Sequence, residues 1–598
     1  MDRNSVIGFS LLAVLVIGYV SYNQHTQTQY LQQKHTDSVA YAKAHPVPVV
    51  DSSRVRQMAA PDNTVNDSIR RSLPAAFNGQ AQTVTLENKK LILQFNTKGA
   101  YPVSALVKNY KTYSQQPLYL FNGKGNELSA ILPVNSGAVA TGDLYFTPVI
   151  KDEPNGDKTI DFGADMGNGK RVDIIYTLPA DDYMMRCDIR LGGMPANTVS
   201  LNWNTAALPT EKDIATERLN SQVYYRYKNT DHDYFTIKSE DKKSLSDVAY
   251  WVGLRKQYFN SILVCKDGFN KVNIDASVKV DSNTAVVTKD VLEAPVKGNG
   301  TVSLQWYIGP NDYRILDRYK LGMEEMVPMG NGIMAFVKYI NKWILLPLFF
   351  FLTSVVSNYG VIILILTLLM RLVLSFFTYK SYLSAAKMRV MKPELDELRK
   401  KHEGDQQKFG MEQMKLYRRV GVNPLGGCLP MLFQLPILFA MYYLFPSLIE
   451  FRQKSVLWAH DLSTYDSIAQ LPFSIPLYGD HVSLFTLLMT ASSLFLAVYN
   501  RNMTPQDPNN PMMKYMPFIF PFVFLGVFNK MAAALTLYYF VSNTLSILQQ
   551  FVIQRYFINE KAIHAQLQEN KNKPVAPSKW AQKMEELQKA QAERGKKK

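Results

Sequence analysis

The chain has 598 residues, a formal net charge of +16 and only three cysteines. Its length exceeds one ordinary domain, so we expect at least two structural units. The cysteines form no CxxC or Cys/His pattern with metal spacing, so zinc and redox chemistry lack support and no metal or other cofactor is expected.

The first predicted element is a membrane anchor at residues 1–23. Ser5 to Val20 is apolar apart from two serines and two glycines. A cleaved signal peptide is the competing interpretation, but the preceding residues carry no net side-chain charge and no A-x-A-like cleavage site follows Val20. Residues 24–80 are polar, with scattered Pro, Ser, Asp and Gln, and are expected to form an extended linker.

Residues 81–325 are predicted to form an all-β sandwich. Several stretches alternate polar and apolar residues with period two, and turn signals such as Asn168-Gly169 and Asn299-Gly300 separate them. Cys187 and Cys265 can either pair in an oxidising compartment or remain buried free thiols. The domain has no nucleophile elbow, paired-carboxylate motif or Gly-rich phosphate loop. We therefore interpret it as a binding or spacing module.

Residues 333–350 are predicted to form an amphipathic helix at the membrane surface. Apolar residues from Ile333 to Ile344 recur at helical spacing against Lys338, Asn341 and Lys342, with Trp343 suited to the interface. A helix packed under the β domain is the alternative.

Five apolar stretches follow, at residues 358–378, 425–449, 482–499, 512–528 and 531–553. Each is near the roughly 20 residues that cross the hydrocarbon core, so with the anchor we expect six spans. Residues 379–423 and the tail at 555–598 are rich in Lys and Arg. The positive-inside rule predicts that both are cytoplasmic, which puts the N-terminus inside and the β domain in the periplasm.

Arg371 is the most informative residue, because it lies inside an otherwise apolar span. A charge at such depth costs about 2.5–3.5 kcal/mol on insertion scales unless it faces water or a partner, and no Asp or Glu lies within the other spans. Snorkelling to the inner interface, with the other polar residues as interhelical glue, is the alternative. We favour a shared hydrophilic groove, with polar residues from three spans: Thr367, Arg371, Ser375, Gln434, Thr536, Tyr539 and Asn543.

The segment 379–423 is predicted to be a helical hairpin, with helices at Ser384–Lys401 and Gln406–Val420 around a Gly404-Asp405 turn. Acidic residues are interspersed among its basic ones, so the charge of this segment does not by itself indicate specific nucleic-acid binding. A docking surface and a plain solvated face both remain open.

Several ordered motifs resemble the YidC-type membrane protein insertases, in the long form with a large periplasmic domain. Arg371 with Thr367 one turn before it resembles the second span of that family. Further matching motifs lie at 385–389, 423–430, 434–437, 457–463 and 537–543. The resemblance covers residues 333–555 strongly and the preceding domain more loosely, through 251–259. One departure is the turn Asn529–Ala534, where the family usually reads Pro-Ser-Gly-Leu.

The resemblance implies a non-enzymatic insertase and chaperone of the inner membrane, working alone or with the Sec translocon. Arg371 would attract acidic residues of a nascent membrane protein, while Thr367 and Tyr539 would contact the entering helix. Leu438 and Phe518 would form a hydrophobic slide into lipid. The hairpin and basic tail would meet the ribosome, the signal recognition particle receptor or the translocon, and the tail's lysines can equally bind anionic lipid.

Two rival functions are less well supported. A secondary transporter usually shows paired repeats and broken helices, and no such internal repeat is present. A membrane-anchored enzyme needs a nucleophile or metal set, whereas His402, His460 and His564 are scattered singly.

Overall fold

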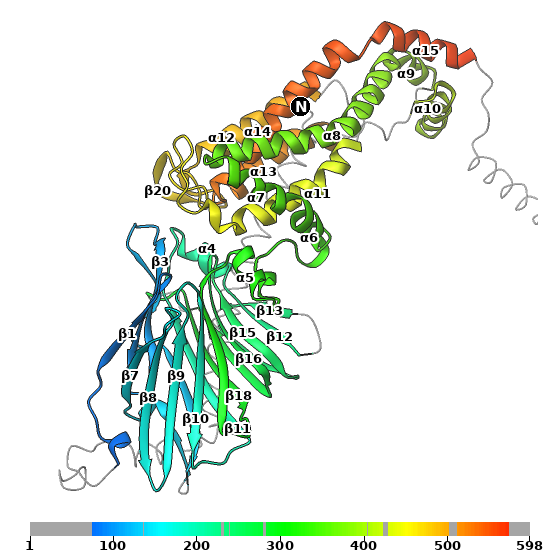
Figure 1. Cartoon of the computed structure of the whole chain (residues 1–598). Helices are drawn as coiled ribbons and strands as arrows, with labels where there is room; N and C mark the ends of the chain where they lie inside the picture. Colours follow the sequence, from blue (N-terminus) through cyan, green and yellow to red (C-terminus); the bar gives the residue numbers. More distant parts are fainter. Residues whose placement is uncertain are drawn as a thin grey trace, which may run out of the picture. The chain divides into compact units, whose positions relative to one another are not determined.

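The computed structural model describes residues 74–134, 137–228, 232–238, 240–278, 283–402, 405–422, 429–500 and 511–572 (Figure 1). The predicted anchor at 1–23 lies outside this part, as do most of the linker (24–73) and of the basic tail (573–598). The chain divides into two compact units, Met1–Pro328 and Met329–Lys598.

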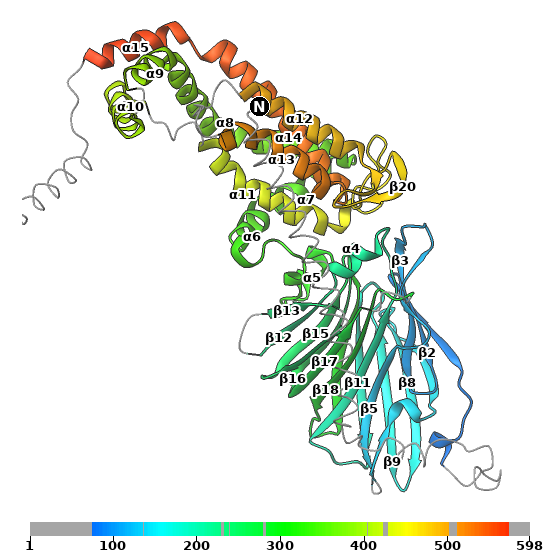
Figure 2. The ribbon, with the colours of Figure 1, turned by 180° about the vertical axis from the view of Figure 1, so that it is seen from behind.

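The described part of the first unit is a sandwich of antiparallel sheets. Figure 1 shows the nine-stranded sheet from one side, and Figure 2 shows the six-stranded sheet from the opposite side. In sheet order the nine strands are β13 (His232–Thr236), β12 (Gln222–Tyr227), β15 (Ala249–Arg255), β16 (Phe259–Phe269), β19 (Thr301–Pro310), β10 (Met184–Gly192), β9 (Lys170–Leu178), β8 (Lys158–Gly167) and β7 (Thr147–Asp152). The six strands are β14 (Glu240–Leu245), β17 (Lys271–Ser277), β18 (Val286–Pro295), β11 (Thr198–Ala207), β5 (Glu127–Val134) and β6 (Gly137–Ala140). A smaller sheet contains β1 (Thr83–Glu87), β2 (Leu91–Asn96), β3 (Tyr101–Lys111) and β4 (Pro117–Asn122).

The core of the sandwich lies between the two larger sheets. Trp203 of β11 and Trp306 of β19 meet edge to face, with ring centroids 6.1 Å apart, and Phe121 of β4 stacks on Trp306. The predicted β-sandwich is therefore confirmed. Cys187 and Cys265 are both buried free thiols, which decides between the two alternatives for this pair. Burial raises the pKa of Cys187 to about 12.

The second unit is helical. It contains α6 (Val337–Ile340), α7 (Leu346–Val355), α8 (Tyr359–Val390), α9 (Lys392–Lys401), α10 (Gln406–Val420), α11 (Leu429–Leu444), α12 (Leu484–Asn500), α13 (Pro511–Phe528), α14 (Ala533–Val552) and α15 (Glu560–Asn572). Helix α14 contacts α8 and α12, while α8 also contacts α11 and α12 contacts α13. These five helices form a bundle. Within the described part of the chain only α8 is long and apolar enough to cross a membrane by itself, and α12 and Tyr515–Phe528 are shorter apolar helices. The total of six spans stays a prediction.

The outer surface of the bundle is apolar. Large exposed side chains follow α8 and α13, including Leu372, Val373, Phe376, Phe522 and Val523, which are 53–67% exposed. Exposed apolar patches of this size on a soluble protein would be unusual. The bundle therefore has the surface of a protein that is surrounded by lipid.

The amphipathic segment at 333–350 is not one regular helix. A π-helical turn at Asn341–Leu345 separates α6 from α7. Asn341 is fully buried there and its Nδ2 donates a hydrogen bond to the carbonyl of Met329 at 2.7 Å. The burial of Asn341 differs from the prediction, which placed this residue on the polar face of the helix. Trp343 and the apolar Ile344 are 69% and 52% exposed.

The first helix of the predicted hairpin begins later than its sequence indicates. Helix α8 runs through the predicted end of its span at residue 378 and ends at Val390, so Ser384–Val390 belongs to α8. Helix α9 starts at Lys392 with Pro393 in its first turn. Proline is tolerated in a first turn, but it has no N–H to continue the hydrogen-bond ladder of α8, which promotes a break at this point.

Two elements were not foreseen from the sequence. Helix α15 occupies part of the predicted tail and packs on α8 and α10 through Ile563 and Leu567. In the loop before α12, the strands β20 (Ala469–Ile475) and β21 (Gly479–Val482) form an antiparallel hairpin.

Candidate functional site

Arg371 lies deep within α8. The helix starts at Tyr359, because the Asn358 side chain accepts hydrogen bonds from the backbone N–H groups of Gly360 and Val361. At 1.5 Å per residue, Arg371 is about 18 Å along the axis from that start. The hydrocarbon core is about 30 Å thick, so in a span that begins at Tyr359 Arg371 would lie about 12 Å from the other end.

The guanidinium of Arg371 joins α8 to α11 and α14. Its Nη1 donates to Gln434 Oε1 at 3.1 Å, and its Nη2 donates to Ser542 Oγ at 2.6 Å. Both acceptors are neutral, and the guanidinium has more N–H donors than these two bonds use. The helices α8 and α11–α14 contain no Asp or Glu. The bundle thus holds a cation that none of these helices neutralises.

A small pocket of about 10 Å³, partly open to solvent, lies beside the guanidinium, and this space holds about one water molecule. Its lining combines polar and apolar side chains from α8, α11 and α14: Thr367, Met370, Arg371, Leu374, Gln434, Ile437, Tyr538 and Ser542. Space of this size lets a water molecule reach the charge, and apolar side chains line the rest of the pocket.

The comparisons with known proteins cover the whole chain. Residues 83–348 match the model of the YidC periplasmic domain, and residues 351–561 match that of the 60Kd inner membrane protein. The membrane protein insertase YidC of Parabacteroides distasonis is 34% identical over 99% of this chain and 98% of its own length. The corresponding protein of Cytophaga hutchinsonii is 36% identical over 96% of this chain and 94% of its own. The chain belongs to the YidC family.

Membership of this family makes the chain an inner-membrane protein with a non-enzymatic role, since the relatives are named membrane protein insertases. A solved structure of an active YidC insertase with its first transmembrane domain resolved covers 84% of this chain and 100% of that one. Its sequence identity is 17% and its TM-score 0.32, which is too low to transfer structural detail.

Three of the predicted groove residues come together. Arg371, Thr367 and Gln434 all line the pocket. Thr367 is buried, and its hydroxyl donates to the carbonyl of Ile363 at 2.6 Å. Because the hydroxyl donates its proton within α8, it can only accept a hydrogen bond from a group in the pocket.

The other predicted groove residues lie outside the pocket lining. Ser375 and Thr536 donate to backbone carbonyls of their own helices, those of Leu372 and Ala533. The hydroxyl of Tyr539 is 3.4 Å from the carbonyl of Leu438.

Asn543 faces another helix. Its Nδ2 donates to Ser493 Oγ of α12 at 2.7 Å, which fits the alternative interpretation of polar residues as interhelical glue.

Two lining residues of α14 were missed, Tyr538 and Ser542. Both belong to the family-like motif at 537–543, in which several neighbouring residues are polar. The sequence indicated a polar stripe on this helix but not its rotation about the axis. The hydrogen bond from Arg371 shows that α14 turns the face with Ser542 towards α8.

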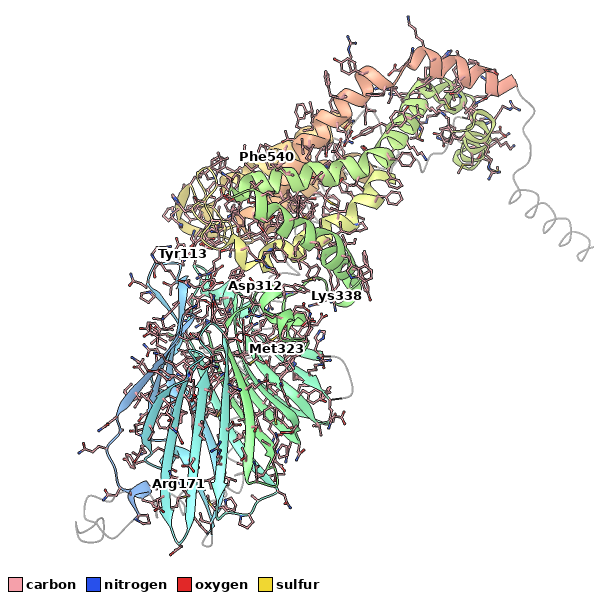
Figure 3. All side chains as sticks on the ribbon, viewed as in Figure 1. Tyr113, Arg171, Asp312, Met323, Lys338 and Phe540 are labelled. Carbon is pink, nitrogen blue, oxygen red and sulfur yellow. The ribbon has the colours of Figure 1, made fainter. Side chains whose placement is uncertain are left out.

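The two predicted slide residues lie on the helices α11 and α13. Leu438 and Phe518 are both half-buried. Helix α13 presents a row of exposed aromatic and aliphatic side chains beyond Phe518, and Phe520 and Phe524 stack with centroids 5.9 Å apart. Figure 3 draws the side chains of the bundle on the ribbon, with Phe540 of α14 labelled.

The first unit contains a second small pocket, of about 10 Å³, lined in part by Lys256 and Asn260. Lys256 forms a buried ion pair with Glu217 at 3.1 Å and also donates to the carbonyl of Leu208. Glu217 in turn accepts hydrogen bonds from the backbone N–H and the hydroxyl of Thr210. Both charges are thus satisfied within the fold, which indicates a structural pair. In the described ranges no group of three or more His, Cys, Asp or Glu side chains is placed to hold a metal ion.

Proposed function

We propose that this chain inserts nascent membrane proteins into the inner membrane through a hydrophilic groove centred on Arg371, alone or with the Sec translocon, and helps them to fold. The observation that carries the proposal is the guanidinium held between α8, α11 and α14 by the neutral side chains of Gln434 and Ser542. A purely structural arginine at this depth would be expected to have a carboxylate partner, because an unpaired buried charge is costly.

The groove would act by lowering the cost of moving a polar segment part-way across the bilayer. A substrate carboxylate entering the pocket would find a positive charge and free N–H donors, so it would lose less of its hydration energy than in lipid. Arg371 is the attracting charge. Thr367, Gln434 and Ser542 are polar neighbours that keep it in the groove.

The energy for insertion would come from the substrate itself. Once its hydrophobic segment reaches lipid, burial contributes about 0.8 kcal/mol per CH₂ group, and the membrane potential acts on its charges. The exposed apolar surface of α13, with Phe518 and Leu438 at its side, would offer the path from groove to lipid. This mechanism uses no nucleotide and no catalytic residue.

The proposed topology puts α9, α10 and α15 in the cytoplasm and the β-sandwich in the periplasm. The basic residues of the hairpin and tail support it through the positive-inside rule. On that side α15 holds the hairpin, since Ile563 and Leu567 pack against Tyr417 and Val420, and Lys571 pairs with Glu394 at 3.3 Å. The hairpin so fixed would be the docking surface for the ribosome, the signal recognition particle receptor or the translocon.

Growth complementation in insertase-depleted cells tests the proposal. The variants are Arg371→Ala and Arg371→Lys, with Lys380→Gln as the matched control. Lys380 is a cation on the same helix that is exposed and lies over the ring of Phe376 at 4.1 Å, so its loss changes the helix charge without touching the groove. We expect rescue by the wild type, the Lys variant and the control, and failure of the Ala variant. A wild-type chain that folds in the membrane yet inserts no single-span substrate would refute the insertase function and favour a transporter.

A further inference from the structure

The loop between α11 and α12 contains a segment without charge. Residues 467–479 read Ser-Ile-Ala-Gln-Leu-Pro-Phe-Ser-Ile-Pro-Leu-Tyr-Gly, and the flanking residues are Asp466 and Asp480. This segment includes β20 and the turn to β21. In the sequence its odd-numbered residues from Ala469 to Leu477 are all apolar, whereas Gln470 and Ser474 are polar. An ordinary solvated hairpin would carry charged side chains on its exposed positions.

The apolar side chains of this segment are exposed. Phe473 and Leu477 are 62% and 60% exposed, and Ile468 is 51% exposed. Leu457, earlier in the same loop, is 77% exposed. Burying one such side chain is worth about 1.5–3 kcal/mol, so several of them exposed within one loop indicate a covering surface.

The base of the hairpin is fixed to the helices. Asp466 accepts hydrogen bonds from the backbone N–H of Phe485 at 3.0 Å and from Trp458 Nε1 at 2.9 Å. Asn529, in the turn between α13 and α14, donates to the carbonyls of Tyr478 and His481 at 2.9 and 2.8 Å. Asp466 and Asn529 are both buried, so the base of the hairpin is held firmly against the helices.

The hairpin surface continues into the apolar surface of α13. Leu477 packs on Gly526 of α13, where an added Cβ would lie 3.7 Å from Leu477 Cβ and 3.5 Å from its carbonyl oxygen. Beside Gly526, Val523 and Val527 are 53% and 48% exposed. Any surface that covers this face of α13 therefore also contacts Leu477. In an inner-membrane protein the cover of an exposed apolar helix face is lipid.

We propose that residues 467–479 form a membrane-inserted hairpin whose apolar side chains, Phe473 and Leu477 foremost, enter the lipid bilayer beside α13. Its depth follows from its backbone. A two-stranded hairpin has unpaired N–H and C=O groups along both edges, which the hydrocarbon core does not tolerate. Pro472 and Pro476 lack N–H groups and reduce this cost, but the remaining groups keep the hairpin at the boundary between headgroups and acyl chains. This position of the hairpin does not depend on whether the chain inserts nascent proteins.

Site-specific fluorescence in proteoliposomes tests the proposal on the full chain. Phe473→Cys carries an NBD probe in a background with Cys428→Ser, since Cys187 and Cys265 are buried. Lys289→Cys, an exposed position on β18, is the aqueous reference, and Val373→Cys, 67% exposed on α8, is the reference within the bilayer. Quenching is measured with iodide in water and with phosphatidylcholine bearing doxyl at carbon 5 or carbon 12.

We expect iodide to quench the probe at residue 473 several-fold less than at residue 289, and 5-doxyl lipid to quench it several-fold more. The 5-doxyl lipid should also exceed the 12-doxyl lipid, the reverse of the order at residue 373. Iodide quenching equal to that at residue 289 would overturn the proposal, as would protection from both iodide and doxyl lipid, which would mean that protein covers the hairpin. Stronger quenching by 12-doxyl than by 5-doxyl lipid would refute the interfacial depth.

Discussion

The charge of Arg371 should matter only to substrates that carry a negative charge, and this dependence can be measured. The perturbation combines Arg371→Ala with a change in a single-span substrate, whose acidic residue in the translocated segment is replaced by its amide. Four combinations form a double-mutant cycle, which isolates the interaction between the two charges from the separate effects of each change. Ser542→Ala serves as the matched control, because it removes one hydrogen bond of Arg371 but keeps the charge.

The size of the effect follows from the environment of the guanidinium. Two unit charges at about 4 Å attract by about 1 kcal/mol in water and about 4 kcal/mol at an effective dielectric constant of about 20. The pocket is partly open to solvent, so an intermediate value of about 2 kcal/mol applies. That energy corresponds to a factor of about 30 in the insertion rate. Wild type should therefore insert the acidic substrate about 30-fold faster relative to Arg371→Ala, beyond any change seen for the amide substrate.

The assay is protease protection of a translated substrate in proteoliposomes that contain the purified chain. Salt provides an internal check, since a groove open to water should lose part of the coupling at high ionic strength. Equal slowing of the acidic and amide substrates by Arg371→Ala would refute the electrostatic role. In that case Arg371 would act as a structural tie between α8, α11 and α14. Loss of coupling in Ser542→Ala would instead show that the charge needs that bond to face the groove.

Three further predictions concern stability. Lys256→Met leaves Glu217 buried and unpaired, so we expect a loss of about 3–5 kcal/mol in the unfolding free energy followed by tryptophan fluorescence; a loss below about 1 kcal/mol would contradict the buried pair. Leu567→Ala removes a core contact of α15 and should raise hydrogen exchange of α10 several-fold while leaving the β-sandwich unchanged. Burial raises the pKa of Asp290 well above its usual range. The folded protein therefore binds this proton more tightly than the unfolded chain does. Its stability falls as the pH rises above about 4, the usual pKa of Asp. Asp290→Asn should thus be more stable than wild type at pH 8 and lose that advantage at pH 4, in chemical denaturation at both pH values.

The β-sandwich could be predicted because its strands bury one face. In β9, for example, Val172, Ile174, Tyr176 and Leu178 are buried and the residues between them are not. Period two is a property of the strand itself and needs no knowledge of the neighbours. The order of the strands in the sheets was not predictable in this way, because it depends on which strands pair across long stretches of sequence.

The residues around Arg371 could be predicted only in part, for a physical reason. Arg371 is unmistakable in an apolar span, and its depth alone requires a polar environment. The partner helix α14 offers polar residues on several sides, so the sequence could not show whether Ser542 or Asn543 faces the arginine. Packing decides this: Asn543 bonds to Ser493 of α12, which leaves Ser542 for Arg371.

Helix α15 and the hairpin at β20 and β21 escaped prediction because their stability comes from tertiary contacts. The sequence of α15 looks like a solvated basic tail, and its few apolar residues gain meaning only through the cluster with α8 and α10. A two-stranded hairpin is at best marginally stable in isolation. The β20–β21 hairpin contains no Asn-Gly or Asp-Gly turn signal and depends on its anchors in the helical unit.

The unusual turn at Asn529–Ala534 and the β20–β21 hairpin are parts of one arrangement. The side chain of Asn529 donates to two carbonyls, those of Tyr478 and His481, and accepts from the backbone N–H of Ser483 at 3.1 Å. Only an amide can donate twice and accept at the same site in so short a side chain. An aspartate would set a carboxylate against two carbonyl oxygens, and a proline or leucine would leave three buried backbone groups unpaired, at about 1–3 kcal/mol each. The hairpin therefore requires an asparagine at this position of the turn.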